Sequence, residues 1–403
     1  MKKVKKFLGL LLGVVTAFSC MAGCEVKKPE DSGQTPEPPN PPVTTPELQP
    51  AEEKDWKTIT TYTEDILPAY VQPIWYTREV YDESVAMIGE TGSANLLYLP
   101  KGNIIVRDYK LQKTYAEGKD YKIEGKTITR IKGGALPFID KNIYDKNVVD
   151  TQMPIKCHLN ISYKTDEMWE GAMPEGQTAK VSKFMNKVKA QKAAKIMFYG
   201  DSITFGCSSS ESLEGGKINP HLPIWADLVT TWLENKYSAK IDTWNEAVGG
   251  WTTGNGKAAF AQKVMAKGAE NIDLLVLGFG MNDIHTHREL YAELIEGMID
   301  TYLTANPNGS VMLVSPMNPN TQTAWLGNQR YFEEDLQGIA ADRDNVAVAQ
   351  VNSVFTQLEA SGKVTRDWLA NNINHPNDFS VRIYAQVLLK TLAGDDFCKE
   401  IYA

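Results

Sequence analysis

A serine follows directly on a short, mostly apolar segment of the chain. The apolar segment is residues 196–199, and Gly200, Asp201 and Ser202 come next. A serine at a strand-to-helix turn can project its hydroxyl from the edge of a sheet, while its own N–H points at the same space. Ser202 is therefore a candidate nucleophile. The alternative interpretation is a helix N-cap serine, which is common after a strand.

Three other segments carry residues that could serve the same chemistry. Asn245 to Gly250 follow a second apolar segment, and Gly280-Met281-Asn282-Asp283 follow a third. His375 lies in Asn371-Asn372-Ile373-Asn374-His375-Pro376-Asn377, before the last helical segment. A histidine within reach of a serine can take its proton as a general base. Taken singly, the glycine could be a turn residue and Asn282 a loop residue that caps a turn.

The elements that must position these residues alternate between strands and helices. We expect strands near residues 196–199, 241–244, 274–279, 311–315 and 346–351. Between and after them we expect helices near residues 222–236, 257–267, 290–303, 328–341 and 381–392. Such alternation predicts a parallel sheet covered on both faces. In open sheets of this kind, ligands bind at the carboxyl ends of the strands, which is where the candidate residues stand.

The four segments, in this order, resemble the conserved blocks of the SGNH or GDSL hydrolases. The resemblance covers about residues 195–395 and implies a three-layer, flavodoxin-like α/β domain with serine esterase activity. It implies that Ser202 is the nucleophile and that His375 is the base. It also implies an oxyanion hole formed by the N–H groups of Ser202 and Gly250 and by the side-chain amide of Asn282. A glycine at 250 would let the backbone approach the substrate. No cofactor and no metal are expected.

The sequence departs from that family at the partner of the histidine. The family has Asp three residues before the His, whereas this chain has Asn372. A neutral amide can hold an imidazole in one tautomer, but it cannot stabilise the imidazolium by charge. Three interpretations stay open: Asn372 orients the ring, a backbone carbonyl steadies a Ser-His dyad, or another acid such as Asp367 or Asp378 acts. A degenerate, inactive enzyme is a further alternative.

The region before the hydrolase-like half has a different pattern. Residues 94–100, 103–108 and 121–131 alternate or run apolar, are punctuated by Gly, Pro and Asp, and contain a hairpin turn at Glu124-Gly125-Lys126. Strands without helices between them predict a small β-sandwich. A β-sandwich followed by an SGNH domain resembles the plan of the carbohydrate esterase family two acetylxylan esterases. We therefore predict a β-rich domain at residues 56–175 and a hydrolase domain at residues 176–403.

The first residues predict an export signal. Four lysines precede the apolar run 7–18, and Met21-Ala22-Gly23-Cys24 resembles a bacterial lipobox. The resemblance implies a signal peptide over residues 1–23, lipidation of Cys24, and a bacterial cell-surface location; the alternative is an ordinary secretory signal. Residues 24–55 are rich in Pro, Thr and Glu and predict an extended linker. Loss of four lysines and no acid takes the net charge from −8 to −12, and no basic stripe indicates nucleic acid.

Several other residues are weaker candidates. His285 and His287 form an HxH pair without further clustered ligands, which favours solvent or the rim of a pocket over a metal site. Trp251 and Trp325 could stack on sugars or simply pack. Cys157, Cys207 and Cys398 are odd in number, so three free thiols are favoured over a Cys157–Cys207 pair.

The function that these observations favour is hydrolysis of an acetylated polysaccharide or another small ester at the cell surface. A lipolytic esterase or lysophospholipase is the alternative enzyme. A glycan-binding surface lipoprotein without turnover is the alternative outside enzymes. The glycan, the acyl group and the oligomeric state are not determined by the sequence.

Overall fold

The computed structural model describes residues 55–146, 153–216 and 218–398 of the chain. These residues form one compact unit. The predicted signal peptide, Cys24 and all but the last residue of the predicted linker lie outside the described residues. Within the described ranges, no helix is long and apolar enough to cross a membrane.

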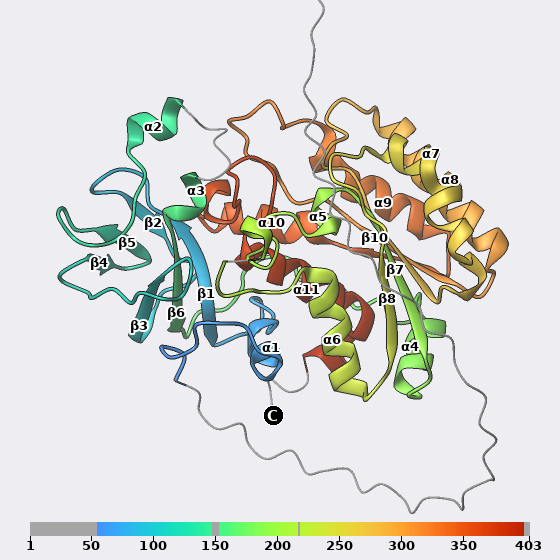
Figure 1. The fold of residues 1–403 in the computed structure, drawn as a ribbon, viewed down its shortest axis with the longest axis horizontal. Coiled ribbons are helices and arrows are strands. Elements are labelled where there is room, and N and C mark those ends of the chain that lie inside the picture. Colours follow the sequence, from blue (N-terminus) through green and yellow to red (C-terminus); the bar gives the residue numbers. More distant parts are fainter. Residues whose placement is uncertain (1–54, 147–152, 217, 399–403) are drawn as a thin grey trace, which may run out of the picture. The chain divides into compact units, whose positions relative to one another are not determined.

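A five-stranded parallel sheet forms the centre of the second half (Figure 1). Its order is β11-β10-β9-β7-β8, and all four strand pairs are parallel. The order confirms the predicted flavodoxin-like α/β fold, in which the first strand lies beside the topological switch point. The strands are β7 (Ala194–Gly200), β8 (Ile241–Asn245), β9 (Leu274–Gly278), β10 (Ser310–Val314) and β11 (Val346–Ala349).

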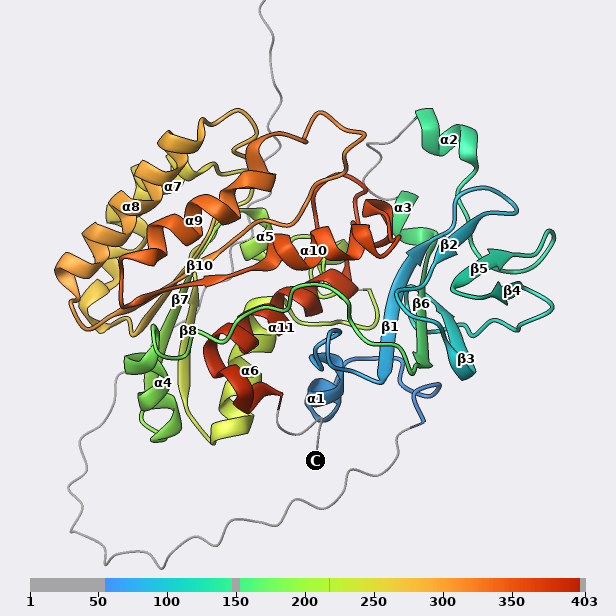
Figure 2. The same ribbon diagram turned by 180° about the vertical axis from the view of Figure 1, so that it is seen from behind.

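Helices cover both faces of this sheet (Figures 1 and 2). Alternate strand residues point to opposite faces, so Met197 and Tyr199 of β7 belong to one hydrophobic cluster while Ile196 and Phe198 belong to another. The first cluster includes α7 (Thr253–Lys263), α8 (Arg288–Ala305) and α9 (Phe332–Ala341). The second includes α4 (Ser182–Lys189), α6 (Trp225–Tyr237), α10 (Val351–Ala360) and α11 (Asp378–Ala393). Of these, α10 was not predicted from the sequence.

The N-terminal region contains two three-stranded antiparallel sheets, as expected of a small β-rich unit. The predicted hairpin is confirmed, since Glu124 pairs with Thr127 and Gly125 has a φ of 61°. One sheet has the order β1-β6-β3 and the other β2-β5-β4. The strands are β1 (Glu79–Ala86), β2 (Ser93–Asn95), β3 (Lys101–Asp108), β4 (Tyr121–Glu124), β5 (Thr127–Arg130) and β6 (His158–Lys164), with short helices α1 (Leu67–Tyr70), α2 (Lys141–Lys146) and α3 (Met153–Lys156).

The two regions share one core. A single hydrophobic cluster contains Val85 and Ile161 from β1 and β6 together with Phe379 and Ile383 from α11. The region before residue 176 therefore packs directly on the helical layer that follows His375.

Candidate active site

Ser202 begins a single-turn helix, α5 (Ser202–Phe205), immediately after β7. Asp201 is the N-cap: its Oδ1 accepts a hydrogen bond from the N–H of Ile203 at 2.9 Å. Gly206 ends the turn with a φ of 93°. The capped turn holds Ser202 at the carboxyl edge of the sheet, where sequence reasoning placed a nucleophile.

The structure brings Ser202 and His375 together. His375 Nε2 lies 3.0 Å from Ser202 Oγ, which is hydrogen-bonding distance. Burial lowers the pKa of His375 to about 4, because the charged ring would lose its hydration. The imidazole is therefore neutral over most of the pH range and can accept the serine proton.

The other ring nitrogen contacts a residue that was not predicted. Ser208 Oγ lies 3.3 Å from His375 Nδ1. If Nε2 is to accept the proton of Ser202, Nδ1 must carry the ring hydrogen and donate it to Ser208 Oγ. Ser208 adopts a φ of 71° in the loop after α5. Its only signal in the sequence is a run of three serines shortly after the nucleophile.

The side chain of Asn372 contacts two other polar residues. Its side-chain oxygen accepts hydrogen bonds from Tyr144 Oη and from Asn320 Nδ2, each at 3.3 Å. Asn320 Nδ2 also donates to the Asn372 carbonyl at 2.7 Å. Among the described residues, the hydrogen bond given for His375 Nδ1 is to Ser208, so the role of Asn372 as orienter stays a prediction. Asn372 itself adopts a positive φ of 55°.

The two alternative acids are also engaged elsewhere. Asp367 accepts hydrogen bonds from the N–H groups of Ala86 and Val364, at 3.0 and 3.2 Å. Asp378 Oδ1 accepts from the Ser210 N–H at 2.7 Å, and burial raises the pKa of Asp378 to about 6. In the described part of the chain, His375 Nδ1 thus contacts the Ser208 hydroxyl, and no contact to Asp367 or Asp378 is seen there.

Asn371 organises the loop that presents His375. Its Oδ1 accepts hydrogen bonds from the N–H groups of Ile373, Asn374 and His375, at 3.0, 3.0 and 2.9 Å. The Asn371 carboxamide thereby accepts hydrogen bonds from three successive backbone N–H groups. An ordinary Asx turn has one such bond, to the residue two positions on. Sequence reasoning assigned no role to Asn371.

Gly250 follows β8, in the position expected of an oxyanion donor. Its φ of 78° favours glycine, whereas a Cβ at this position would meet nothing within 4 Å. The backbone conformation by itself therefore favours glycine at this position, and the close approach of a substrate to Gly250 stays a prediction. A Cβ at Gly249 would instead lie 3.8 Å from the Cβ of Ser202.

Asn282 follows β9, and its side-chain amide is held by the neighbouring block. Asn282 Nδ2 donates to the Trp251 carbonyl at 2.9 Å, which leaves the second hydrogen of the amide for a developing oxyanion.

Two buried carboxyl groups connect the loops that follow β7, β8 and β9. Asp201 Oδ2 accepts from the Met281 N–H at 3.3 Å, and Asp283 Oδ2 accepts from the Thr253 N–H at 2.9 Å.

The weaker candidates lie at the periphery or in packing positions. His285 and His287 are exposed, and the described residues contain no group of three metal-ligating side chains. Trp251 is half-buried edge-on against Tyr199, with ring centroids 6.4 Å apart. Trp325 is also half-buried. Cys157, Cys207 and Cys398 are free thiols, as favoured from the sequence.

Comparison with known families identifies the part of the chain that contains this site. Residues 198–380 match the model of the GDSL-like lipase/acylhydrolase family. This part of the chain is similar to GDSL-like hydrolase domains. The match begins in β7 and ends in α11, so it includes the positions of Ser202, Gly250, Asn282 and His375. Carboxylic ester hydrolysis is the activity that this family description implies for the matched part.

Solved structures that are similar to part of this chain include several esterases. A two-domain esterase (CEX) active on acetylated mannans, co-crystallised with mannopentaose, is 24% identical over 57% of this chain and 55% of its own, with a TM-score of 0.43. Axe2, an acetylxylan esterase from Geobacillus stearothermophilus, is 19% identical over 49% of this chain and 93% of its own, with a TM-score of 0.40. This chain therefore spans about half the length of the two-domain esterase. No protein of curated function matches the chain.

Because the neutral Ser208 hydroxyl contacts His375 Nδ1, a carboxylate at position 208 should change the pH dependence of catalysis. In Ser208→Asp, a negative charge beside the ring should raise the pKa of His375, because it favours the protonated form. The acid limb of the kcat profile, expected near pH 4 in the wild type, should then move to higher pH. Asp is among the residues that tolerate a positive φ such as the one at this position.

Asn372→Asp is the matched control for that experiment. Its carboxylate would face Tyr144 and Asn320, so the acid limb should move much less than in Ser208→Asp. Rate profiles of both variants on one aryl acetate make the comparison. A larger shift in Asn372→Asp would contradict the assignment of Ser208.

Proposed function

We propose that this chain is a serine esterase that removes O-acetyl groups from carbohydrate at the bacterial cell surface. The observation that carries the chemistry is the contact of 3.0 Å between Ser202 Oγ and His375 Nε2 at the carboxyl edge of the sheet. Ser202 attacks the acetyl carbonyl while Nε2 takes its proton. The N–H groups of Ser202 and Gly250 and the free hydrogen of the Asn282 amide stabilise the oxyanion.

The second half of the reaction reverses these roles. The imidazolium returns its proton to the departing sugar hydroxyl, and an acetyl-Ser202 ester remains. Water then attacks that ester, His375 again takes a proton, and acetate leaves with Ser202 restored. A neutral Ser208 hydroxyl holds the tautomer throughout but adds no charge, which accords with the low pKa of His375.

The choice of a carbohydrate rests on the polar surroundings of the His375 loop. An open cavity of about 300 Å³ adjoins this loop, since its lining residues Tyr144 and Asn320 both hydrogen-bond Asn372. All of its lining residues except Val364 have polar side chains, which suits a hydroxyl-rich molecule better than a fatty acyl chain. The lining is Tyr144, Asn320, Thr321, Gln322, Glu359, Lys363, Val364, Thr365 and Arg366.

Hydrolysis of a graded series of esters tests this function. We expect acetate esters to be cleaved with a much higher kcat/KM than octanoate or palmitate esters of the same alcohol. Acetylated xylan and acetylated glucomannan should both release acetate, with de-acetylated polymer as the blank. A preference for long acyl chains would favour a lipolytic enzyme. Binding of the polymers without release of acetate would favour a glycan-binding protein.

We also propose that lipidation of Cys24 anchors the enzyme to the membrane. The proposal rests on the Met21-Ala22-Gly23-Cys24 sequence after the apolar run. The wild type should fractionate with membranes, and Cys24→Ala should be released or stay unprocessed, because buried acyl chains supply about 0.8 kcal/mol per CH₂. Cys20→Ala is the matched control and should fractionate as the wild type does. Wild-type protein found wholly in the medium would contradict the anchor.

A further inference from the structure

Strand β1 contacts the chain shortly before His375, at Lys363 and Asp367. Lys363 Nζ donates to Glu83 Oε1 at 2.6 Å and to the Ser84 carbonyl at 3.0 Å, and the side chains of Lys363 and Glu83 are completely buried. The N–H of Ala86 donates to Asp367 Oδ1 at 3.0 Å. Lys363 and Asp367, which precede the His375 loop, are thus held by residues 83–86 of one strand.

The same strand also contacts the chain after His375. Asn377 Nδ2 donates to Ser84 Oγ at 2.9 Å, and Arg382 Nη2 donates to the Asp82 carbonyl at 2.7 Å. Asn377 and Arg382 lie on the other side of His375 from Lys363. Residues 82–86 of β1 therefore contact the chain both before and after the histidine.

The loop between these anchors is closed on itself. The Ala370 N–H donates to the His375 carbonyl, and the Asn377 N–H donates to the Trp368 carbonyl, each at 2.9 Å. Together with the three hydrogen bonds to Asn371, these contacts make residues 368–377 a small, internally bonded unit. The position of the imidazole relative to Ser202 then depends on where the unit is attached.

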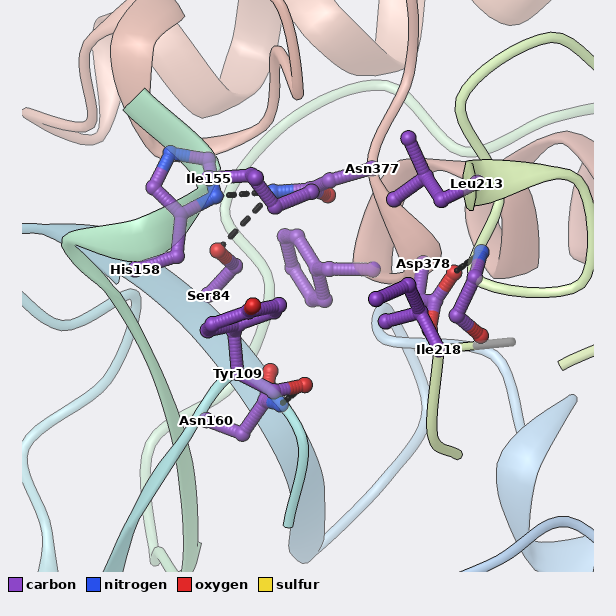
Figure 3. A pocket seen from close by; sticks show the side chains of 11 residues that line it. Ser84, Tyr109, Ile155, His158, Asn160, Leu213, Ile218, Asn377 and Asp378 are labelled. Atoms are coloured by element: carbon purple, nitrogen blue, oxygen red, sulfur yellow. Dashed lines mark hydrogen bonds between the residues drawn. The ribbon is translucent and has the colours of Figure 1, made fainter. Parts of the chain in front are cut away.

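Asn377 is the attachment nearest to the histidine. Its Nδ2 lies 2.9 Å from Ser84 Oγ and 3.3 Å from His158 Nδ1 (Figure 3). It also lies 3.0 Å from the Asp367 carbonyl. Its Oδ1 accepts from the Ser380 N–H at 3.2 Å and so caps α11. Burial lowers the pKa of His158 to about 4, which keeps that ring neutral and able to accept from Asn377.

We propose that Ser84 is a positioning residue for His375, acting through Asn377, and that β1 is thereby part of the catalytic unit. The proposal rests on the role of His375 as base in the proposed function. Displacement of a catalytic group by about 1 Å can cost on the order of 10²-fold in rate. Loss of the Ser84 hydroxyl removes the shortest contact of Asn377 Nδ2, two residues from the imidazole, and leaves those to the Asp367 carbonyl and to His158.

The test compares two buried serines of the same sheet. Ser84→Ala removes the hydroxyl that lies 2.9 Å from Asn377 Nδ2. Ser162→Ala, on β6, removes a hydroxyl that contacts Asp82 at 2.9 and 3.2 Å but touches nothing in the His375 loop. For Ser84→Ala we expect a fall of about tenfold in kcat on a small aryl acetate, with KM unchanged and an equal fall in the rate of inactivation by a fluorophosphonate. For Ser162→Ala we expect a lower Tm but wild-type kcat.

Two further variants at position 84 separate loss of the hydroxyl from a failure to fold. Ser84→Thr retains the hydroxyl and should restore most of kcat. If Ser84→Ala does not fold, Ser84→Cys, with a weaker acceptor, should show an intermediate loss. Wild-type kcat in whichever of Ser84→Ala and Ser84→Cys folds, or an equal loss in Ser162→Ala, would overturn the proposal while leaving the esterase function intact. An inactive wild type, or full activity in Ser202→Ala, would overturn the proposed function and this inference with it.

Discussion

Ser202→Ala should lower kcat on an aryl acetate on the order of 10⁴-fold or more, since it removes the only atom that forms the covalent intermediate. Residual turnover would come from the oxyanion donors and from binding. Ser202 is buried and its recorded side-chain partner is the His375 ring, so the substitution should leave Tm nearly unchanged.

Covalent labelling and a matched serine make this experiment decisive. A fluorophosphonate should label the wild type at Ser202 and leave the variant unlabelled. Ser212→Ala is the control, because Ser212 is exposed, lies in the same loop region and contacts the Ser209 hydroxyl instead of His375. Label on any other serine, or persistent turnover in Ser202→Ala, would refute the nucleophile.

Asn282→Ala should lower kcat by roughly 10²–10³-fold, corresponding to a barrier increase of about 2.7–4 kcal/mol. The amide is anchored by the Trp251 carbonyl, so its other hydrogen is directed before the substrate binds. Because the oxyanion develops only in the transition state, KM should change little. The loss should therefore be almost entirely in kcat.

Asn255→Ala separates this effect from local destabilisation. Asn255 belongs to the capping box of α7, where it contacts Thr252, so its loss should cost about 1 kcal/mol of stability without touching the site. Thermal unfolding and steady-state kinetics of both variants provide the comparison. An Asn282→Ala enzyme with wild-type kcat would remove this residue from the oxyanion hole.

The sequence by itself determined the sheet and the reactive pair. Short apolar segments at regular intervals, separated by helical periods, specify buried parallel strands, because such strands are apolar on both faces. Residues at the ends of strands meet at one edge of the sheet whatever the details of packing. Ser202, Gly250 and Asn282 could thus be located from chain order, and His375 from the block before α11.

Only the tertiary structure decided what holds the histidine. The Nδ1 partner is Ser208, 167 residues away along the chain, and the Asn372 side chain contacts Tyr144 and Asn320. The anchors of the His375 loop come from β1, about 290 residues earlier, for instance Ser84 with Asn377. Local patterns in a sequence report which face of an element is buried. They do not report which distant polar groups pair, because that choice depends on loop conformations such as the positive φ of Asn372 and Ser208.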